Sequence, residues 1–176
     1  MPSLNPASRE RVLVLLRHAR AESWGETDHD RHLADEGRAD AGAAGRWLAE
    51  QGLVPDHALV SSATRTQETW QSLAEAAGWS LEPQLDDGLY SAGPDTVLDL
   101  VRGTSSEART LVVIGHNPTV AYLAQMLDDG DGDPTAAADM VMGYPTCALT
   151  VLTFDGDWSA LDLASATVTA FHVGRA

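Results

Sequence analysis

Two histidines and two arginines follow short apolar runs in this sequence. Arg17 and His18 close the first run, His116 comes just after the third, and Arg65 lies a few residues beyond the second. A neutral imidazole is a nucleophile that can carry a phosphoryl group, and an imidazole protonated near neutral pH stabilises negative charge. The planar fork of arginine binds phosphate oxygens in pairs. If the three runs are neighbouring strands, these side chains meet at one sheet edge and predict phosphoryl transfer.

The charge balance makes these arginines informative. The chain has 176 residues, with 26 acidic and 11 basic ones, a formal net charge of −15, and no lysine. Such a charge argues against DNA, RNA or an anionic membrane as the main partner. Arg65 also falls in the first turn of a predicted helix, where the helix dipole disfavours a cation. An anion bound beside Arg65 is therefore a better interpretation than a surface role.

Strands and helices alternate along the predicted chain. The apolar runs at residues 12–16, 58–60 and 111–114 predict strands buried on both faces, as in parallel sheets. Apolar residues at helical spacing predict helices over 35–51, 64–77 and 117–127, and another that begins at Pro94. The remaining segments are a short strand at 81–85, a mobile acidic loop at 128–138, and two strands at 148–154 and 161–173.

This alternation implies a three-layer α/β/α sandwich, with a largely parallel central sheet and an antiparallel edge strand. We expect a single domain over residues 1–176, in which residues 1–10 form a flexible N-terminus. Cys147 is the one cysteine, which excludes a disulfide framework within the chain. The sequence has no apolar signal core and no run long enough to span a membrane, so we expect a soluble, cytoplasmic protein.

The polar segments after the three runs form an ordered set of motifs. They are Leu16-Arg17-His18-Ala19-Arg20-Ala21-Glu22, Ser61-Ser62-Ala63-Thr64-Arg65-Thr66 and Gly115-His116-Asn117-Pro118. Supporting matches are Arg31-His32-Leu33 with Gly37, Leu89-Tyr90, Tyr144-Pro145-Thr146 and Trp158. Together these residues resemble the histidine phosphatase superfamily, with its phosphoglycerate mutase-like fold, and most closely its small phosphohistidine phosphatase (SixA-like) branch. The resemblance covers residues 12–171.

The resemblance implies a hydrolase that acts through a phosphohistidine intermediate. His18 would be the nucleophile, Arg17 and Arg65 would hold the phosphoryl oxygens, and His116 would complete the pocket. The implied substrate is a phosphohistidine on a signalling protein, and a small-molecule phosphomonoester is the alternative. A phospho-ligand binding module without turnover is a third interpretation, which the intact histidines disfavour. No metal or organic cofactor is implied, so the expected activity is independent of metals.

Asp87 and Arg20 are further candidates for substrate binding at the predicted site. Mutase-like relatives carry a glutamate after the second arginine motif, and Asp87 is the carboxylate that could protonate a leaving group here. A phosphohistidine substrate needs less of this help, because an imidazole leaves readily once its ring is protonated. Arg20 either lines the mouth of the pocket or is an ordinary solvated arginine.

Two acidic segments suggest metal sites at first sight. His29 and His32 are three residues apart between carboxylates, but a polar loop at a substrate entrance is the preferred interpretation. Residues 129–133 begin like a calcium loop, yet Pro134 replaces the required glycine and Met140 the closing glutamate. Trp24 follows the first motif and is interpreted as a wall of the pocket.

Overall fold

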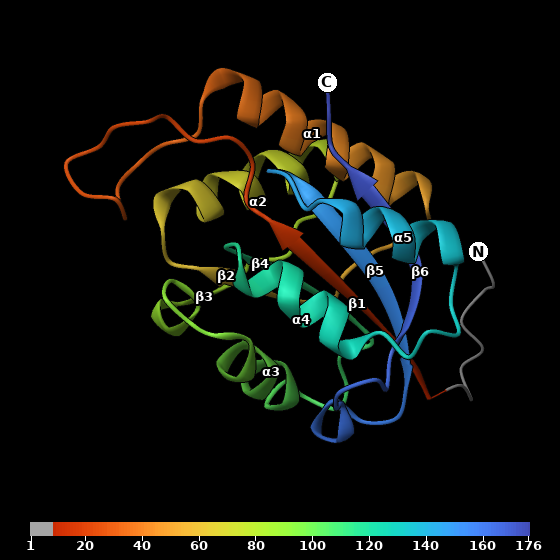
Figure 1. The fold of residues 1–176 in the computed structure, drawn as a ribbon. Helices are drawn as coiled ribbons and strands as arrows, with labels where there is room; N and C mark the ends of the chain where they lie inside the picture. Colours follow the sequence, from red (N-terminus) through yellow and green to blue (C-terminus); the bar gives the residue numbers. More distant parts are fainter. Residues whose placement is uncertain (1–8) are drawn as a thin grey trace.

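One six-stranded sheet is the frame of the protein, and the computed structural model describes it within residues 9–176 (Figure 1). The strands are β1 (Glu10–Arg17), β2 (His57–Ser61), β3 (Gln84–Asp86), β4 (Thr110–Gly115), β5 (Ala148–Asp155) and β6 (Thr167–Val173). Their order is β3-β2-β4-β1-β5-β6. β1 to β4 run parallel, whereas β5 is antiparallel to both β1 and β6. The predicted largely parallel sheet with an antiparallel edge is confirmed, and β5 is the reversed strand.

Helices cover both faces of this sheet (Figure 1). They are α1 (Asp35–Glu50), α2 (Thr64–Ala77), α3 (Pro94–Arg102), α4 (Thr119–Leu127) and α5 (Pro134–Met142), with 3₁₀ turns at Asp87–Leu89 and Trp158–Ala160. The buried side chains of α1 and α2 pack on one face, and those of α3, α4 and α5 pack on the other. The predicted three-layer arrangement follows directly from this division.

β1 shows why the sheet needs helices on both sides. Its side chains alternate, so Val12, Val14 and Leu16 pack toward α1 and α2, while Leu13 and Leu15 pack toward α3 and α4. All five side chains are buried. A strand that is apolar on both faces is stable only in the middle layer, and this places its last residue, Arg17, at the centre of the sheet edge.

Two glycines let α1 approach its neighbours closely. A Cβ atom on Gly45 would lie 2.1 Å from the carbonyl oxygen of Leu73 in α2, and one on Gly37 would lie 2.1 Å from that of Arg20. Both distances are far inside van der Waals contact with backbone atoms, so a side chain at either position would force the backbone apart. The contact at Gly37 presses the first turn of α1 against the segment that follows His18.

The acidic segment at 128–138 is not a loop throughout, and this corrects the prediction. Helix α5 begins at Pro134, and the Asp133 carboxylate caps it by accepting a hydrogen bond from the Ala136 amide at 2.8 Å. Ala136 and Met140, four residues apart, are buried on the sheet. Because many aspartates and glycines precede Pro134, the sequence pattern did not indicate this capped helix of nine residues.

Two predicted strands have different bounds in the structure. β3 is limited to Gln84–Asp86, because Pro83 has no amide proton to donate to a strand ladder. The strand predicted at 161–173 begins only at Thr167. The segment before it turns instead, with Ala164 at a φ of 53° and the Ser165 hydroxyl bonded to the Asp162 carbonyl. Trp158 is fully buried just before this turn and donates to the Ala108 carbonyl.

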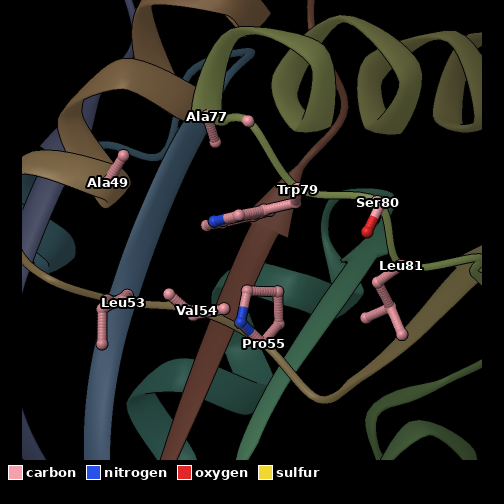
Figure 2. A pocket seen from close by; sticks show the side chains of 9 residues that line it. Ala49, Leu53, Val54, Pro55, Ala77, Trp79, Ser80 and Leu81 are labelled. Carbon is pink, nitrogen blue, oxygen red and sulfur yellow. The ribbon is translucent and has the colours of Figure 1, made fainter.

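A hollow of about 530 Å³ lies beside the ends of α1 and α2 (Figure 2). The indole of Trp79 lies across it, with Leu53, Val54 and Pro55 opposite. These last three residues lead into the amino-terminal end of β2. The hollow is therefore at the other end of β2 from the polar motif that begins at Ser61.

Only part of the predicted flexible N-terminus lies within the described residues 9–176. The predicted flexible N-terminus falls on residues 1–10; residues 1–8 lie outside those that the structure describes, and β1 already begins at Glu10. Within residues 9–176, no helix combines the length and the apolar character needed to cross a bilayer. A cytoplasmic location and a single domain over 1–176 stay predictions.

Candidate active site

His18 and His116 meet at the carboxyl ends of neighbouring parallel strands. β1 pairs with β4 in a register that places Arg17 opposite Gly115. Each histidine is the first residue after its strand. The ladder continues one step further, because the His18 amide donates to the Gly115 carbonyl at 3.1 Å. The two imidazole rings lie with their centroids 5.3 Å apart. The predicted neighbouring of the strands is confirmed, since β2 flanks β4 on its other side.

The ring of His18 is held in one tautomer. Its Nδ1 lies 2.7 Å from the carbonyl oxygen of Ala19, which can only accept a hydrogen bond. Nδ1 therefore carries the proton, and the lone pair of the neutral ring is on Nε2. The Ala19 amide is itself fixed by Thr69 of α2 at 3.0 Å. The segment after β1 thus presents Nε2 as the nucleophilic atom.

The ring of His116 is held from both nitrogens. Nδ1 lies 3.4 Å from Nη2 of Arg65, and because a guanidinium only donates, Nδ1 is the acceptor. Nε2 then donates to the Ser61 hydroxyl at 2.8 Å. Ser61 is the last residue of β2 and is fully buried. β2, β4 and the first turn of α2 therefore converge on this one imidazole.

Two buried guanidinium nitrogens at the site have nothing to donate to. Arg17 donates Nη1 to the Tyr144 carbonyl at 3.0 Å, and Arg65 uses both terminal nitrogens on Asp28. The Nε atoms of both arginines are covered, yet within residues 9–176 neither has an acceptor. A buried unsatisfied donor costs about 1–3 kcal/mol, and more when it is charged. An oxyanion is the kind of ligand that accepts hydrogen bonds from such donors.

Arg11 shows that an unsatisfied Nε does not by itself make a site. Its Nε also has no acceptor in the part of the chain that the structure describes. Its terminal nitrogens, however, are bonded to the carbonyls of Ser106 and Gly156 and to Asp157, and its guanidinium packs on Trp158. Arg11 ties together the amino end of the sheet, whereas Arg17 and Arg65 stand beside two histidines.

Burial keeps both histidines neutral. Desolvation, with a smaller contribution from the nearby charges of Arg65 and Arg17, lowers the pKa of His18 to about 3. Desolvation and then the charge of Arg65 lower the pKa of His116 to about 4. The sequence predicted one imidazole protonated near neutral pH, and the burial of both rings, beside Arg65 and Arg17, disfavours this charge.

The depressed pKa values predict a specific titration. In phosphate-free buffer, the rings of His18 and His116 should not titrate between pH 8 and pH 5, where an ordinary imidazole changes charge near pH 6.5. Below pH 6.5 the unfolded chain binds protons that the folded site does not, so these residues should make the fold less stable as the pH falls. Ring ¹⁵N NMR measures this, and a midpoint near pH 6.5 for either ring would contradict the expected burial.

The structure leaves the other two candidates away from this centre. Arg20 is exposed and donates to Glu36 of α1 at 2.7 Å, and none of its contacts with other described residues is with the histidines. Asp87 is exposed in the 3₁₀ turn after β3, and its carboxylate has no hydrogen bond or ion pair within residues 9–176. Trp24 is 76% exposed and lines a small hollow with Glu22, Glu26 and His32. The binding roles of Arg20 and Asp87 stay predictions that this geometry does not support.

The carboxylate that does reach the site is Asp28. It accepts from Nη2 of Arg65 at 3.2 Å and from the Tyr90 hydroxyl at 2.5 Å. Tyr90 in turn packs edge-on against His116, with centroids 5.6 Å apart, and against His29 at 4.8 Å. Asp28 and Tyr90 were not among the candidate site residues predicted from the sequence. Asp28 belongs to the polar loop that was considered for a metal, and Tyr90 to one of the supporting matches of the resemblance. The described residues contain no group of three or more histidine, cysteine or acidic side chains that could hold a metal ion.

Comparison with known proteins agrees with this geometry. The sequence model of the histidine phosphatase superfamily, branch 1, matches residues 13–91, a span that includes Arg17, His18 and Arg65. A solved protein of Nakamurella multipartitia, assigned as a phosphohistidine phosphatase SixA, is 32% identical, with a TM-score of 0.83 over 98% of this chain and 100% of that one. This chain belongs to the histidine phosphatase superfamily. Within the superfamily it is a member of the SixA-like branch.

Two further relatives support this placement. A second solved protein assigned as SixA, from Agrobacterium tumefaciens, is 29% identical, with a TM-score of 0.75 over 92% of this chain and 97% of that one. An uncharacterised protein of Mycobacterium tuberculosis is 36% identical over 162 residues, which cover 91% of this chain and all of that protein. The similarity therefore covers almost the whole chain. Membership of this branch makes the chain a histidine phosphatase that acts on a phosphorylated substrate.

Proposed function

We propose that this SixA-like chain hydrolyses phosphohistidine on a signalling protein, through a phosphoryl group carried by His18. The observation that supports this most strongly is the juxtaposition of a free imidazole Nε2 with the unpartnered Nε atoms of Arg17 and Arg65. A nucleophile lies near two arginines whose buried Nε atoms have no acceptor among the described residues. That arrangement fits a transferring phosphoryl group better than a stored metal or a neutral ligand.

The first step forms the covalent intermediate. The lone pair of His18 Nε2 attacks phosphorus, a new P–N bond forms, and the bond to the leaving group breaks with its electron pair going to the leaving atom. Arg17 and Arg65 bind the equatorial oxygens, where negative charge is spread in the transition state. The Nδ1 hydrogen bond to the Ala19 carbonyl stabilises the positive charge that develops on the ring.

The second step returns the enzyme to its starting state. A water molecule attacks the phosphorus of phospho-His18, the P–Nε2 bond breaks, and its electron pair returns to the imidazole. The proton lost by water is taken up by the departing phosphate or by solvent. The negative charge of the bound phosphoryl group raises the pKa of His116. A proton taken from solvent at Nδ1 then lets this ring donate to a phosphoryl oxygen in place of accepting from Arg65.

The titratable groups beside the site favour a leaving group that needs no proton donor. The Tyr90 hydroxyl and the charge of Arg65 lower the pKa of Asp28 to about 2, so it is ionised at neutral pH. The bond to Asp28 raises the pKa of Tyr90. Asp28 therefore carries no proton at neutral pH, and Tyr90 does not readily give up its own. An imidazole that is protonated before the P–N bond breaks leaves as a neutral ring, whereas an alkoxide leaves poorly without an acid.

Phosphate release from two substrates tests this proposal. A phosphohistidine protein and an alkyl phosphate ester, β-glycerophosphate, are assayed side by side at pH 7, each with EDTA. We expect turnover of the phosphohistidine with EDTA present, and at least about 100-fold lower kcat/KM on the ester, the scale of general-acid catalysis. Comparable turnover of the ester would contradict the preference for a P–N bond and favour the small-molecule phosphatase. Loss of turnover in EDTA would contradict independence from metals, and binding without turnover on either substrate would favour a binding module.

A further inference from the structure

Asp28 occupies one end of the Arg65 guanidinium and leaves the rest of it free. The backbone carbonyl of Asp28 accepts from Nη1 of Arg65 at 2.8 Å, and its carboxylate accepts from Nη2 at 3.2 Å. The side chain of Arg65 is almost completely buried, so it has few other ways to be held. Its Nε remains without an acceptor among the described residues. Asp28 therefore binds both terminal nitrogens of the guanidinium and does not bind Nε.

Tyr90 holds Asp28 in this place. Its hydroxyl donates to the same carboxylate oxygen that accepts from Arg65. Its ring lies under the guanidinium, 5.8 Å from the carbon of Arg65, and edge-on to His116. The other carboxylate oxygen of Asp28 accepts from Nε of Arg31 at 3.0 Å, which fixes the carboxylate within its own loop. The carbonyl and one carboxylate oxygen of Asp28 thus hold Arg65, and Arg31 and Tyr90 hold the carboxylate.

We infer that Asp28 and Tyr90 form a positioning pair that orients Arg65 for the phosphoryl group. The inference rests on the proposed phosphoryl site and adds two residues to it that act through Arg65. A long arginine side chain has many rotamers, and holding it in one before the anion arrives lowers the entropic cost of binding. Asp28 acts against the anion in one respect, since its own negative charge repels phosphate. Orientation and repulsion can be separated by experiment.

Binding of inorganic phosphate separates them without requiring turnover. Asp28→Ala removes both the acceptor and the charge, whereas Asp28→Asn removes the charge and keeps an acceptor oxygen for Arg65 and Tyr90. If orientation dominates, Asp28→Ala should raise the phosphate Kd about tenfold, equivalent to about 1.4 kcal/mol. Asp28→Asn should then bind phosphate as tightly as the wild-type protein or more tightly. If both variants bind more tightly, or Asp28→Ala has no effect, the positioning role is wrong.

A double-mutant cycle tests whether Asp28 acts through Arg65. Asp28→Ala should cause no further loss of phosphate binding in an Arg65→Ala background, because the group that it orients is gone and only the repulsion by its carboxylate is removed. Equal losses in the two backgrounds would overturn the inference. Tyr90→Phe, which keeps the ring, should weaken phosphate binding about threefold, and in an Asp28→Ala background it should add nothing. An additive loss would mean that Tyr90 does not act through Asp28.

A neighbouring aspartate provides the matched control. Asp30→Ala removes the same charge from the same loop. Asp30 bonds to Thr27 and lies 3.8 Å from His29, and it has no hydrogen bond or ion pair with Arg65, so the phosphate Kd of this variant should stay within about twofold of the wild-type value. Circular dichroism checks that each variant is folded. A wild-type protein that binds phosphate through this coupled pair without turnover would contradict the proposed function alone. A wild-type protein that binds no phosphate would overturn both proposals.

Discussion

Replacing His18 with alanine should abolish turnover of phosphohistidine while the fold stays intact. The reaction as proposed has no second nucleophile beside the two arginines, since His116 is held by Arg65 and Ser61 through both ring nitrogens. Loss of the nucleophile of a covalent hydrolase lowers kcat by about 10⁶-fold, and a loss of that order is expected here. The measurement is kcat on a phosphohistidine protein, with circular dichroism to confirm the fold.

His57 gives the control for this substitution. It begins β2, at the opposite end of the sheet from the site, so His57→Ala removes an imidazole without touching the proposed reaction. Its kcat should stay within about threefold of the wild-type value, as for a site without shared partners. His18→Ala that retained a kcat near the wild-type value would show that His18 carries no phosphoryl group.

Replacing Arg65 with alanine should give the second-largest loss. Its guanidinium is buried, it lies against His116, and it has a free Nε where a phosphoryl oxygen is expected. Removing one such preorganised donor from other enzymes costs about 2.7–4 kcal/mol, or 10²-fold to 10³-fold in kcat. We expect a loss of that size in kcat/KM, together with much weaker binding of inorganic phosphate.

Arg65→Lys refines this test, because lysine keeps the charge but has no planar fork. If orientation of the fork matters, lysine should recover only a small part of the lost rate. Arg102→Ala is the control, since Arg102 pairs with Asp99 and Asp162 on the outer side of α3 and not with the site. Full recovery by lysine would show that charge alone is needed, and an unaffected Arg65→Ala would remove Arg65 from the proposed site.

The centre of the site was predictable because strand ends are predictable. The runs before Arg17, Ser61 and Gly115 are apolar throughout, and this pattern identifies central parallel strands. Parallel neighbours end at a common edge, so the residues that follow them must converge. Arg65 followed in the same way, since α2 begins at Thr64, close behind the end of β2.

The periphery of the site could not be predicted in this way. Asp28 lies in a loop without hydropathy periodicity, and only the folded path of that loop brings it to Arg65 and Tyr90. Asp87 was chosen by its position after the second arginine motif, but a 3₁₀ turn leaves it exposed. The charge state of His116 depends on burial, which spacing along the chain does not report.

Covalent phosphorylation of His18 is the step on which the proposed reaction depends, and it can be trapped. The protein is mixed with a ³²P-labelled phosphohistidine protein, quenched in alkali to preserve P–N bonds, digested, and analysed by mass spectrometry. The label should appear on the peptide that contains His18, attached to this residue, and should be absent from His18→Ala. Label on another residue, or steady turnover with no labelled peptide under conditions that trap a phosphohistidine standard, would contradict a phospho-His18 intermediate.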